Sequence, residues 1–519
     1  MTSDNRNNIN NVPRDLNYSR VLDVHVWSDY KEVNDFVSLI YDAYFSSQNG
    51  KKSVSKRHIK LVLLDLYVVW ITDPDLNIAV TMTRDFYSKS FGTNDSRYNE
   101  LNISAKTIGV VSTLRDNGLI GYVVGKEAQE GFAHGFVSRI WAEPLLINMF
   151  EKAAFNELMV WNDDNREVIV LREYVEKIKG KKKAKAKAVG YDETEETQSQ
   201  RLVVQQYNNL LERTFIDIGE AETPVLTIEK RVGSKNPDKP HRVHISHKSK
   251  WTRRIFNNSS FTESGRFYGG FWQRIGEDHR KKILINDEET RELDFSSLHP
   301  VLAYANAGVD YWKEYPNVGP YDIPVDGIDD SKVAREIVKK LLLLALNASD
   351  QASLFKAFRS EFDYSLLEET FSFPDAVLSK ILDSIKAKHP VIADQIATGA
   401  GTMLMNLDGK IVEFVIKRFL ASNTPVLSVH DSFIVQTSQR DKLQTAMKDA
   451  WVFVTGQEVT KYKQNLPLHQ DAAAWKNVDF GFYLDRLAEL PKPQIRTTGY
   501  LNRLNKHNKF FNPKTITKV

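Results

Sequence analysis

Pro425-Val-Leu-Ser-Val-His-Asp-Ser-Phe-Ile-Val435 is an apolar run with a single carboxylate near its centre, Asp431. A second run, Glu292-Leu-Asp-Phe-Ser-Ser-Leu-His-Pro300, carries Asp294. In each run we expect a β-strand that meets a turn, so that the sheet fixes the main chain while the carboxylate points into open space. Oxygen ligands in that position suit Mg²⁺, with Mn²⁺ as a second possibility. Two such aspartates predict a pair of metal ions about 3.5–4 Å apart.

Two further stretches lie on either side of the second run. Arg335-Glu-Ile-Val-Lys339-Lys-Leu-Leu-Leu343-Leu-Ala-Leu-Asn347-Ala348 has the spacing of a helix on which Arg335, Lys339, Leu343 and Asn347 form one stripe. Upstream stands Ser264-Gly265-Arg266-Phe267-Tyr268-Gly269-Gly270. Each pattern alone is most simply a turn residue, a solvated helix face or a glycine turn. Their order along the chain is what favours a shared function.

The four elements resemble the catalytic motifs of single-subunit, right-hand nucleic-acid polymerases. Both the polymerase I-like (family A) DNA polymerases and the phage-type and mitochondrial RNA polymerases are similar. Val429–Phe433 resembles motif C, Asp294–His299 motif A, Arg335–Ala348 motif B, and Ser264–Gly270 the Gly-Arg element that precedes motif A. Motif B in these families normally ends in Tyr-Gly, whereas this chain has Asn347-Ala348.

The resemblance implies an α+β fold of palm, fingers and thumb over residues 201–490 and nucleotidyl transfer with two Mg²⁺ ions. It places the metals on Asp294 and Asp431 and the triphosphate on Arg335 and Lys339. It assigns the incoming nucleotide to Leu343, Asn347 and His299, and the nucleic-acid strands to Gly265, Arg266, Tyr268 and His430. The implied partners are a DNA template, a growing DNA or RNA strand and nucleoside triphosphates.

The choice of sugar depends on His299, which lies five residues after Asp294. A bulky imidazole there favours deoxynucleotides, but the same ring can donate a hydrogen bond to a 2′-hydroxyl and favour ribose. Ser432 resembles the RNA polymerases. We slightly favour a DNA polymerase of a phage or mobile element, with an RNA polymerase or primase as the close alternative. A winged-helix replication initiator or regulator with an inactive polymerase fold is the alternative from another class.

Residues 1–176 are expected to form a separate α/β module. Tyr98–Gly125 predicts a turn, a helix and a strand, with Ser104 as the helix N-cap and Gly118 just past the helix end. A second short strand is predicted at Phe136–Ile140. This order resembles a winged helix-turn-helix, which implies DNA contacts by Lys106 and Arg115. An ordinary helix packed on a hairpin is the alternative.

Three charged segments complete the chain. Residues 177–200 join a lysine-rich block to an acidic block and predict a linker, because they contain too little apolar surface to fold alone. The cations of His241–Arg254 predict either phosphate contacts or a solvated loop. The basic tail, 491–519, carries Tyr500, Phe510 and Phe511, which would stack on bases or attach the tail to the body.

Composition sets outer limits. A chain of 519 residues is expected to hold two or three domains. The absence of cysteine excludes disulfides and Cys-ligated zinc. Neither a membrane-spanning apolar run nor a signal peptide is predicted, which favours the cytoplasm and no membrane partner. The net charge is only +3, so partner arguments depend on where the charges lie.

Overall fold

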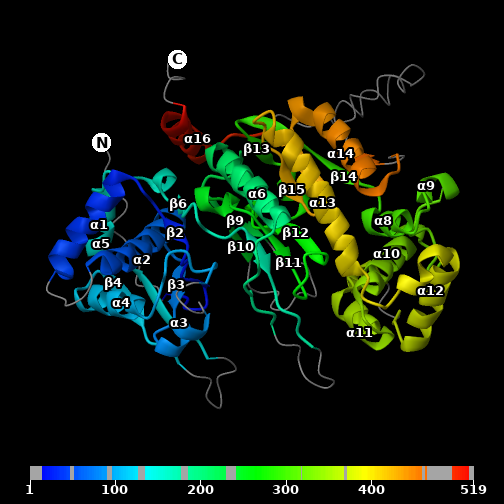
Figure 1. Cartoon of the computed structure of the whole chain (residues 1–519), viewed down its shortest axis with the longest axis horizontal. Coiled ribbons are helices and arrows are strands. Elements are labelled where there is room, and N and C mark those ends of the chain that lie inside the picture. Colours follow the sequence, from blue (N-terminus) through cyan, green and yellow to red (C-terminus); the bar gives the residue numbers. More distant parts are fainter. Residues whose placement is uncertain are drawn as a thin grey trace. The chain divides into compact units, whose positions relative to one another are not determined.

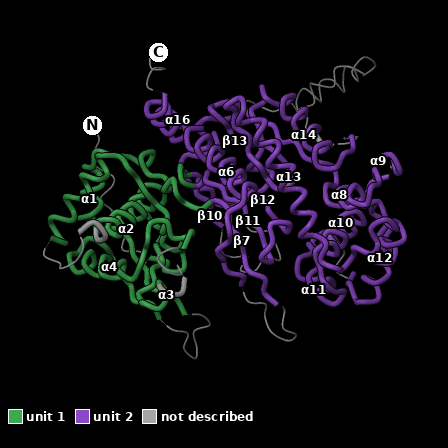
Figure 2. The backbone as a smooth tube through the Cα atoms, in the orientation of Figure 1, with its two compact units in different colours: residues 1–167, 246–248 green, residues 168–245, 249–519 purple. Residues whose placement is uncertain are grey.

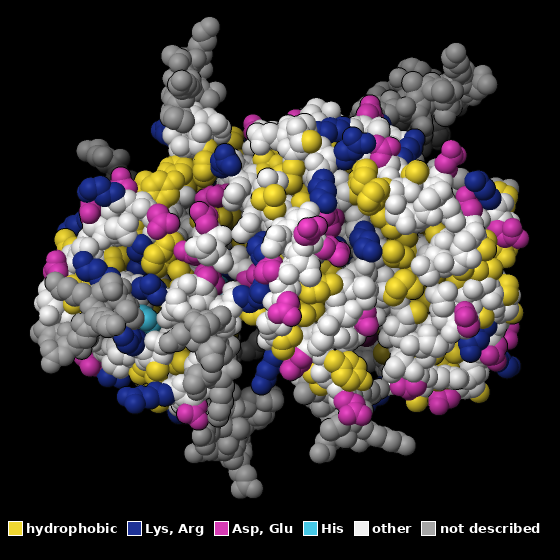
Figure 3. Space-filling model, viewed as in Figure 1, with side chains coloured by type: hydrophobic (Ala, Val, Ile, Leu, Met, Phe, Trp, Pro, Cys, Tyr) yellow, Lys and Arg dark blue, Asp and Glu magenta, His cyan; other side chains and the backbone are white. Residues whose placement is uncertain are grey.

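The computed structural model describes residues 14–46, 52–90, 96–126, 135–176, 185–228, 241–316, 318–367, 371–458, 462–464 and 494–512. The fold mixes α-helices and β-strands (Figure 1). The chain divides into two compact units (Figure 2). Unit 1 contains residues 1–167 and 246–248, and unit 2 contains residues 168–245 and 249–519. On the face of the molecule in Figure 3, acidic and basic side chains are interspersed, in keeping with the small net charge.

Unit 1 is built around one sheet and one central helix. The sheet has the strand order β1-β3-β5-β4, from Ser19–Val21, Asn77–Val80, Ser138–Ala142 and Ile120–Val123. A second pair joins β2 (Val26–Trp27) to β6 (Trp161–Asn162). The helices are α1 (Lys31–Tyr44), α2 (Lys52–Thr72), α3 (Arg84–Ser90), α4 (Lys106–Asp116), α5 (Pro144–Glu151) and the short η1 (Glu157–Met159). Helix α2 is buried on nearly all sides from His58 to Val69, as expected for a helix whose apolar residues occupy every face.

The helix and hairpin predicted in this unit are present, in a larger setting. Gly118 has φ = 70° and follows the end of α4, as predicted. The N-cap is Ala105 instead of Ser104, because the Ser104 hydroxyl lies 3.1 Å from Nε2 of His58 on α2. Strand β5 pairs with both β4 and β3, so the hairpin belongs to a four-stranded mixed sheet. Part of the predicted loop between the two strands, residues 127–134, lies outside the described residues.

Unit 2 contains three sheets. The largest has six strands, in the order β15-β16-β14-β13-β8 with β17 also paired to β14. Their bounds are β8 Ile216–Ile218, β13 Ile283–Ile285, β14 Glu288–Phe295, β15 Leu427–Val429, β16 Ser432–Gln436 and β17 Tyr462–Gln464. A second sheet joins β12 (Ser264–Tyr268), β11 (Arg253–Phe256) and β7 (Ile169–Leu171), and a third joins β10 (His241–His244) to β9 (Val225–Ile228).

The helices of unit 2 surround these sheets. They are α6 Glu195–Arg213, α7 Glu277–Arg280, α8 Leu298–Asn306, α9 Tyr311–Glu314, α10 Ser331–Asn347, α11 Gln351–Glu361, α12 Asp375–Lys388, α13 Gly401–Leu420, α14 Arg440–Thr455 and α16 Thr498–Phe511. Short 3₁₀ turns are η3 Phe271–Arg274, η4 Tyr364–Leu366, η5 Pro390–Gln395 and η6 Thr437–Gln439, while η2 (His247–Lys250) crosses between the units. Helix α13 contacts β12, α6, α8 and α14, which makes it the central helix of the unit.

Helix α13 approaches β12 closely at two glycines. A Cβ atom on Gly409 would lie 2.4 Å from the carbonyl oxygen of Gly265. Gly265 itself has φ = 86°, and a Cβ there would lie 2.6 Å from the ring of Phe256. Backbone can approach this closely only where side chains are absent. The Gly-Arg element is therefore held against α13 by its main chain.

The charged segments depart from expectation in instructive ways. Of the predicted linker 177–200, residues 177–184 lie outside the described residues, and its last residues form the first turns of α6. Thr194 and Thr197 cap that helix reciprocally, and Val203, Val204 and Leu211 are buried along it. A cap and an apolar face together extend the helix into the polar segment.

Three cations of the 241–254 cluster are buried inside the protein and bound to protein groups. Lys250 donates to the carbonyl oxygens of Glu212 and Thr214 at 2.9 and 2.8 Å. Arg254 pairs with Glu413 at 2.5 Å, and in unit 1 Lys248 pairs with Asp23 at 2.8 Å. Neither phosphate contact nor a solvated loop describes these three residues.

The C-terminal tail is attached to the body of unit 2 through Tyr500. This ring is buried against Phe215 and Leu284, and its hydroxyl donates to Asp287 at 2.9 Å. Arg503 adds an ion pair with the buried Asp217 at 2.7 Å. Of the two roles predicted for Tyr500, attachment of the tail is the one that the structure supports.

Candidate active site

The two aspartates lie side by side at one end of the six-stranded sheet. Strands β14 and β16 are antiparallel, with Asp294 opposite Ser432. Asp431 belongs to the two-residue turn between β15 and β16, and its carbonyl oxygen lies 3.5 Å from the amide nitrogen of Phe295. The predicted convergence of two strand-end carboxylates is therefore present.

The turn that carries Asp431 has a strained backbone. His430 has φ = 54°, in the left-handed region that non-glycine residues seldom adopt. Its ring contacts that of Tyr268 edge-on, with centroids 6.0 Å apart, and its Nδ1 is buried without a hydrogen-bond partner among the described residues. Burial and the charge of Arg266 lower the pKa of His430, so the ring is neutral. Strain of this kind concentrates at functional sites.

A cavity of about 300 Å³ opens beside the two aspartates. It is lined by Glu277, Arg280, Glu292, Asp294, Val429, His430, Asp431 and Ser432. Four of these side chains are carboxylates and one is an arginine, so the cavity has an excess of negative charge. A concave surface with that charge attracts divalent cations.

Glu292 is a lining residue that the sequence analysis did not identify. Its Oε2 accepts from Nε of Arg280 at 2.9 Å and its Oε1 accepts from the hydroxyl of Ser432 at 2.5 Å. The signal for it is the period of two along a strand, which puts Glu292 on the same face as Asp294. Its two partners tie Ser432, the neighbour of Asp431, to strand β14.

Among the described residues, no group of three or more His, Asp or Glu side chains is arranged to hold a metal ion. Two aspartates are nevertheless a sufficient protein contribution for Mg²⁺, which keeps several waters and completes its shell with substrate phosphates. Asp294 and Asp431 fit such a site because both come from a rigid sheet end and both line the acidic cavity.

The predicted stripe on α10 is present. The opposite face of the helix is buried through Ile337, Leu341 and Leu346, while Arg335, Lys339 and Leu343 are half-buried. Asn347 is exposed and donates through Nδ2 to the carbonyl oxygen of Leu343 at 2.7 Å, closing the end of the helix.

Tyr321 connects this helix to the aspartates. The guanidinium of Arg335 lies over the Tyr321 ring, 5.1 Å from its centroid. Burial raises the pKa of Tyr321, and the negative charges of Asp431 and Asp294 raise it further. The ring therefore lies between the cation of α10 and the two carboxylates. Arg335 also pairs with Asp322 at 3.6 Å.

A second cluster surrounds Arg266 of the Gly-Arg element. Its Nε donates to Oδ2 of Asp408 at 2.5 Å, and its Nη2 donates to Nε2 of His299 at 2.5 Å. Asp408 lies on α13 and is fully buried. The sequence analysis missed Asp408, although a carboxylate within the apolar helix pattern of Gly401–Leu420 was a usable signal.

Lys106 and Arg115 lie on α4 of unit 1 and are exposed. Arg115 pairs with Asp116 at 2.7 Å and lies over the ring of Tyr122. An exposed ion pair of this kind contributes little stability. Both cations are sterically accessible to a partner, as the winged-helix interpretation requires.

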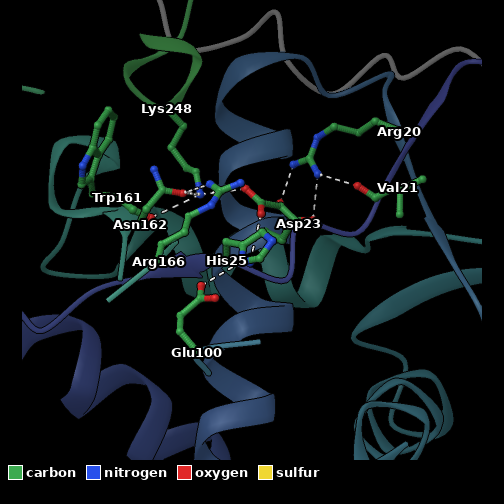
Figure 4. A network of polar contacts seen from close by, with 10 residues as sticks. Arg20, Val21, Asp23, His25, Glu100, Trp161, Asn162, Arg166 and Lys248 are labelled. Atoms are coloured by element: carbon green, nitrogen blue, oxygen red, sulfur yellow. Dashed lines mark hydrogen bonds and ion pairs between the residues drawn. The ribbon is translucent and has the colours of Figure 1, made fainter. Parts of the chain in front are cut away.

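Unit 1 also contains a polar network that the sequence analysis missed (Figure 4). Asp23 pairs with Lys248 at 2.8 Å, His25 bonds Glu100 at 2.8 Å, and Arg20 pairs with the buried Asp65 at 2.5 Å. Lys248 also donates to the carbonyl oxygen of Trp161 at 3.2 Å. Positive and negative groups alternate through the network, which fits a structural role in fastening residues 246–248 to unit 1.

No protein-family model matches the chain, and no curated protein resembles it significantly. None of the helices that the structure describes is both long and apolar enough to cross a lipid bilayer.

Proposed function

We propose that this protein is a template-directed nucleotidyltransferase that extends a nucleic-acid strand on a DNA template. The observation that carries the proposal is the convergence of Asp294 and Asp431 at one end of adjacent strands, beside an acidic cavity. In this proposal the six-stranded sheet serves as the palm of a right-hand polymerase, and α10 with its neighbours α11 and α12 serves as the fingers. Unit 1 serves as a winged-helix-like DNA-binding module.

Asp294 and Asp431 would hold two Mg²⁺ ions between them. Bound there, the metal ions lower the pKa of the attacking 3′-hydroxyl and stabilise the departing pyrophosphate. The sheet supplies the fixed geometry, because both carboxylates project from main chain that is hydrogen-bonded in neighbouring strands. Preorganised ligands avoid reorganisation when charge develops in the transition state.

Arg335 and Lys339 would bind the triphosphate from α10. Their present partners are distant, since Arg335 lies 3.6 Å from Asp322 and Lys339 lies 3.9 Å from Glu336. Exposed pairs of this kind are weak and are readily exchanged for phosphate oxygens. Arginine offers a planar fork and lysine a compact charge, which suits adjacent phosphoryl groups.

Replacement of either aspartate tests the proposal directly. We expect Asp294→Asn and Asp431→Asn to reduce incorporation to background on primed and unprimed templates with Mg²⁺ and either dNTPs or NTPs. Each change removes a ligand charge at nearly constant volume, so folding and template binding are expected to persist. Asp441→Asn is the matched control, because Asp441 is an exposed aspartate on α14. Turnover by either variant at the wild-type rate contradicts the assignment.

The same assay separates the proposal from its alternative in another class. A non-catalytic initiator or regulator would bind the template and incorporate no nucleotide, and Asp294→Asn would then change nothing. The lining of the cavity argues against that alternative, because an inactive site has no physical reason to keep several carboxylates close together. Their mutual repulsion costs stability unless a cation offsets it.

A further inference from the structure

We propose that Asp408 is a positioning residue that acts through Arg266 to hold His299 as a rigid wall against the sugar of the incoming nucleotide. The substrates that this wall favours are deoxynucleoside triphosphates, because it fills the space that a 2′-hydroxyl would need. The proposal rests on the proposed function and names the substrate class of that site.

The first step of the argument is that Arg266 bridges two groups that are distant in sequence. One edge of its guanidinium donates to Asp408 on α13, and the other donates to His299 at the start of α8. A planar guanidinium offers its donors in a fixed fork, so fixing one edge fixes the direction of the other. Asp408 therefore sets the position of His299 without touching it, since their nearest printed atoms lie 4.0 Å apart.

The second step concerns the state of the His299 ring. Arginine has no acceptor, so the nitrogen that it contacts must be the unprotonated one. His299 is thus the neutral tautomer with its proton on Nδ1. Burial, together with the charge of Arg266, lowers the pKa of His299 to about 3, which keeps the ring neutral at physiological pH. A ring held in one tautomer and one orientation is a better steric filter than a ring that can rotate.

The third step is that Asp408 is costly to keep. Its side chain is fully buried, and its Oδ1 has no hydrogen-bond partner among the described residues. Burial and the nearby charge of Asp431 raise the pKa of Asp408 to about 7, against the opposing effect of Arg266. A buried carboxylate oxygen without a partner destabilises a fold. Positioning of Arg266 gives a reason for its presence that packing alone does not.

The test compares NTP and dNTP incorporation by wild type, Asp408→Ala, His299→Ala and the double variant. Removing a steric conflict of about 1–3 kcal/mol predicts that His299→Ala raises NTP use relative to dNTP use by about 5- to 160-fold. We expect Asp408→Ala to raise the same ratio by a smaller factor, of at least about 5-fold at the lower end of that range. The double variant should match His299→Ala, because Asp408 acts through the ring. Lys410→Ala, an exposed change on the same helix, is the control that should leave the ratio unchanged.

Selective ¹⁵N-histidine labelling provides a readout that needs no turnover. The signals of His299 are assigned by their loss in His299→Ala. We expect Nδ1 to be protonated and Nε2 unprotonated in the wild type, with mixed tautomers in Asp408→Ala. Asp408→Asn, which keeps the shape and removes the charge, replaces Asp408→Ala if that variant does not fold.

Several outcomes overturn the proposal. An unchanged His299 tautomer in the Asp408 variants would show that Asp408 does not position the ring. A falling NTP ratio would show that the ring recognises the 2′-hydroxyl, and additive effects in the double variant would show that the two residues act separately. If the wild type incorporates no nucleotide, the proposed function fails on its own. The calorimetric affinities for dATP and ATP with Ca²⁺ then decide the sugar question, and equal affinities overturn it.

Discussion

Single buried charges define much of unit 2, and Lys250 is the clearest case. Its ammonium group is buried, and only two backbone carbonyl oxygens accept from it directly. Burial lowers the pKa of Lys250 to about 7, although the charges of Glu212 and Asp217 oppose that shift. In the unfolded chain a lysine titrates near 10.4. The folded protein therefore binds fewer protons than the unfolded chain between these two pKa values.

A pH-dependent stability follows from this difference. When the folded pKa of a lysine is depressed, its burial destabilises the fold fully below the folded pKa, and the penalty is relieved as pH rises toward the unfolded pKa. We expect the free energy of unfolding of the wild type to rise relative to Lys250→Met between pH 7 and pH 10, by up to about 1.4 kcal/mol per pH unit. Urea denaturation of both proteins across that range measures the difference. A constant difference would show that Lys250 titrates normally.

At this scale the sequence predicted some site residues and missed others for a physical reason. Asp294 and Asp431 were predictable because each follows a local apolar run and needs only its own strand to be placed. Glu292 was within reach of the same period-two pattern. Asp408 acquires its role only from Arg266, which lies 142 residues away in the sequence. A single sequence without its fold does not show a pairing of that range.

At the scale of elements, the packing of α13 on β12 decides where Asp408 and Arg266 meet. The contact depends on Gly409, whose missing side chain admits the carbonyl oxygen of Gly265. Arg254 strengthens the contact by donating from Nε to that same oxygen at 2.7 Å. The sequence predicted the Gly-Arg element as a contact for nucleic acid. In the structure its glycine is instead enclosed by protein, while Arg266 points to the site cluster.

Gly409→Ala tests this packing. The new Cβ would lie 2.4 Å from a backbone oxygen that cannot rotate away, so α13 must shift. We expect a loss of about 1–3 kcal/mol in the free energy of unfolding, and reduced incorporation because the adjacent Asp408 moves with the helix.

Gly109→Ala is the matched control for this change. Gly109 is also a helix-interior glycine, but nothing lies within 4 Å of its added Cβ. There we expect a gain of about 0.5–1 kcal/mol, since alanine is the better helix former. Equal effects of the two substitutions in urea denaturation would remove the close approach as the cause.

For the whole molecule, the division between the units falls before the boundary expected at residue 176. Strand β7, Ile169–Leu171, pairs in parallel with β11, and β11 in turn pairs with β12. The amide of Arg254 also donates to the carbonyl oxygen of Val168 at 2.8 Å. Composition suggested a boundary at the lysine-rich block, because local sequence cannot reveal that a short strand pairs with a partner some eighty residues later.

Two truncations that differ only by β7 separate DNA binding from catalysis. We expect residues 168–519 to extend a pre-annealed primer almost as the full chain does, while binding duplex DNA more weakly and with a flatter salt dependence, because fewer phosphates are neutralised. Removal of residues 1–176 should additionally lower the melting temperature and the extension rate. That cut takes away the strand that pairs with β11, next to the strand that carries Arg266. Primer extension, thermal melting and binding at several salt concentrations compare the two. Equal extension by both chains would show that β7 is dispensable, and equal loss in both would show that the catalytic body needs unit 1.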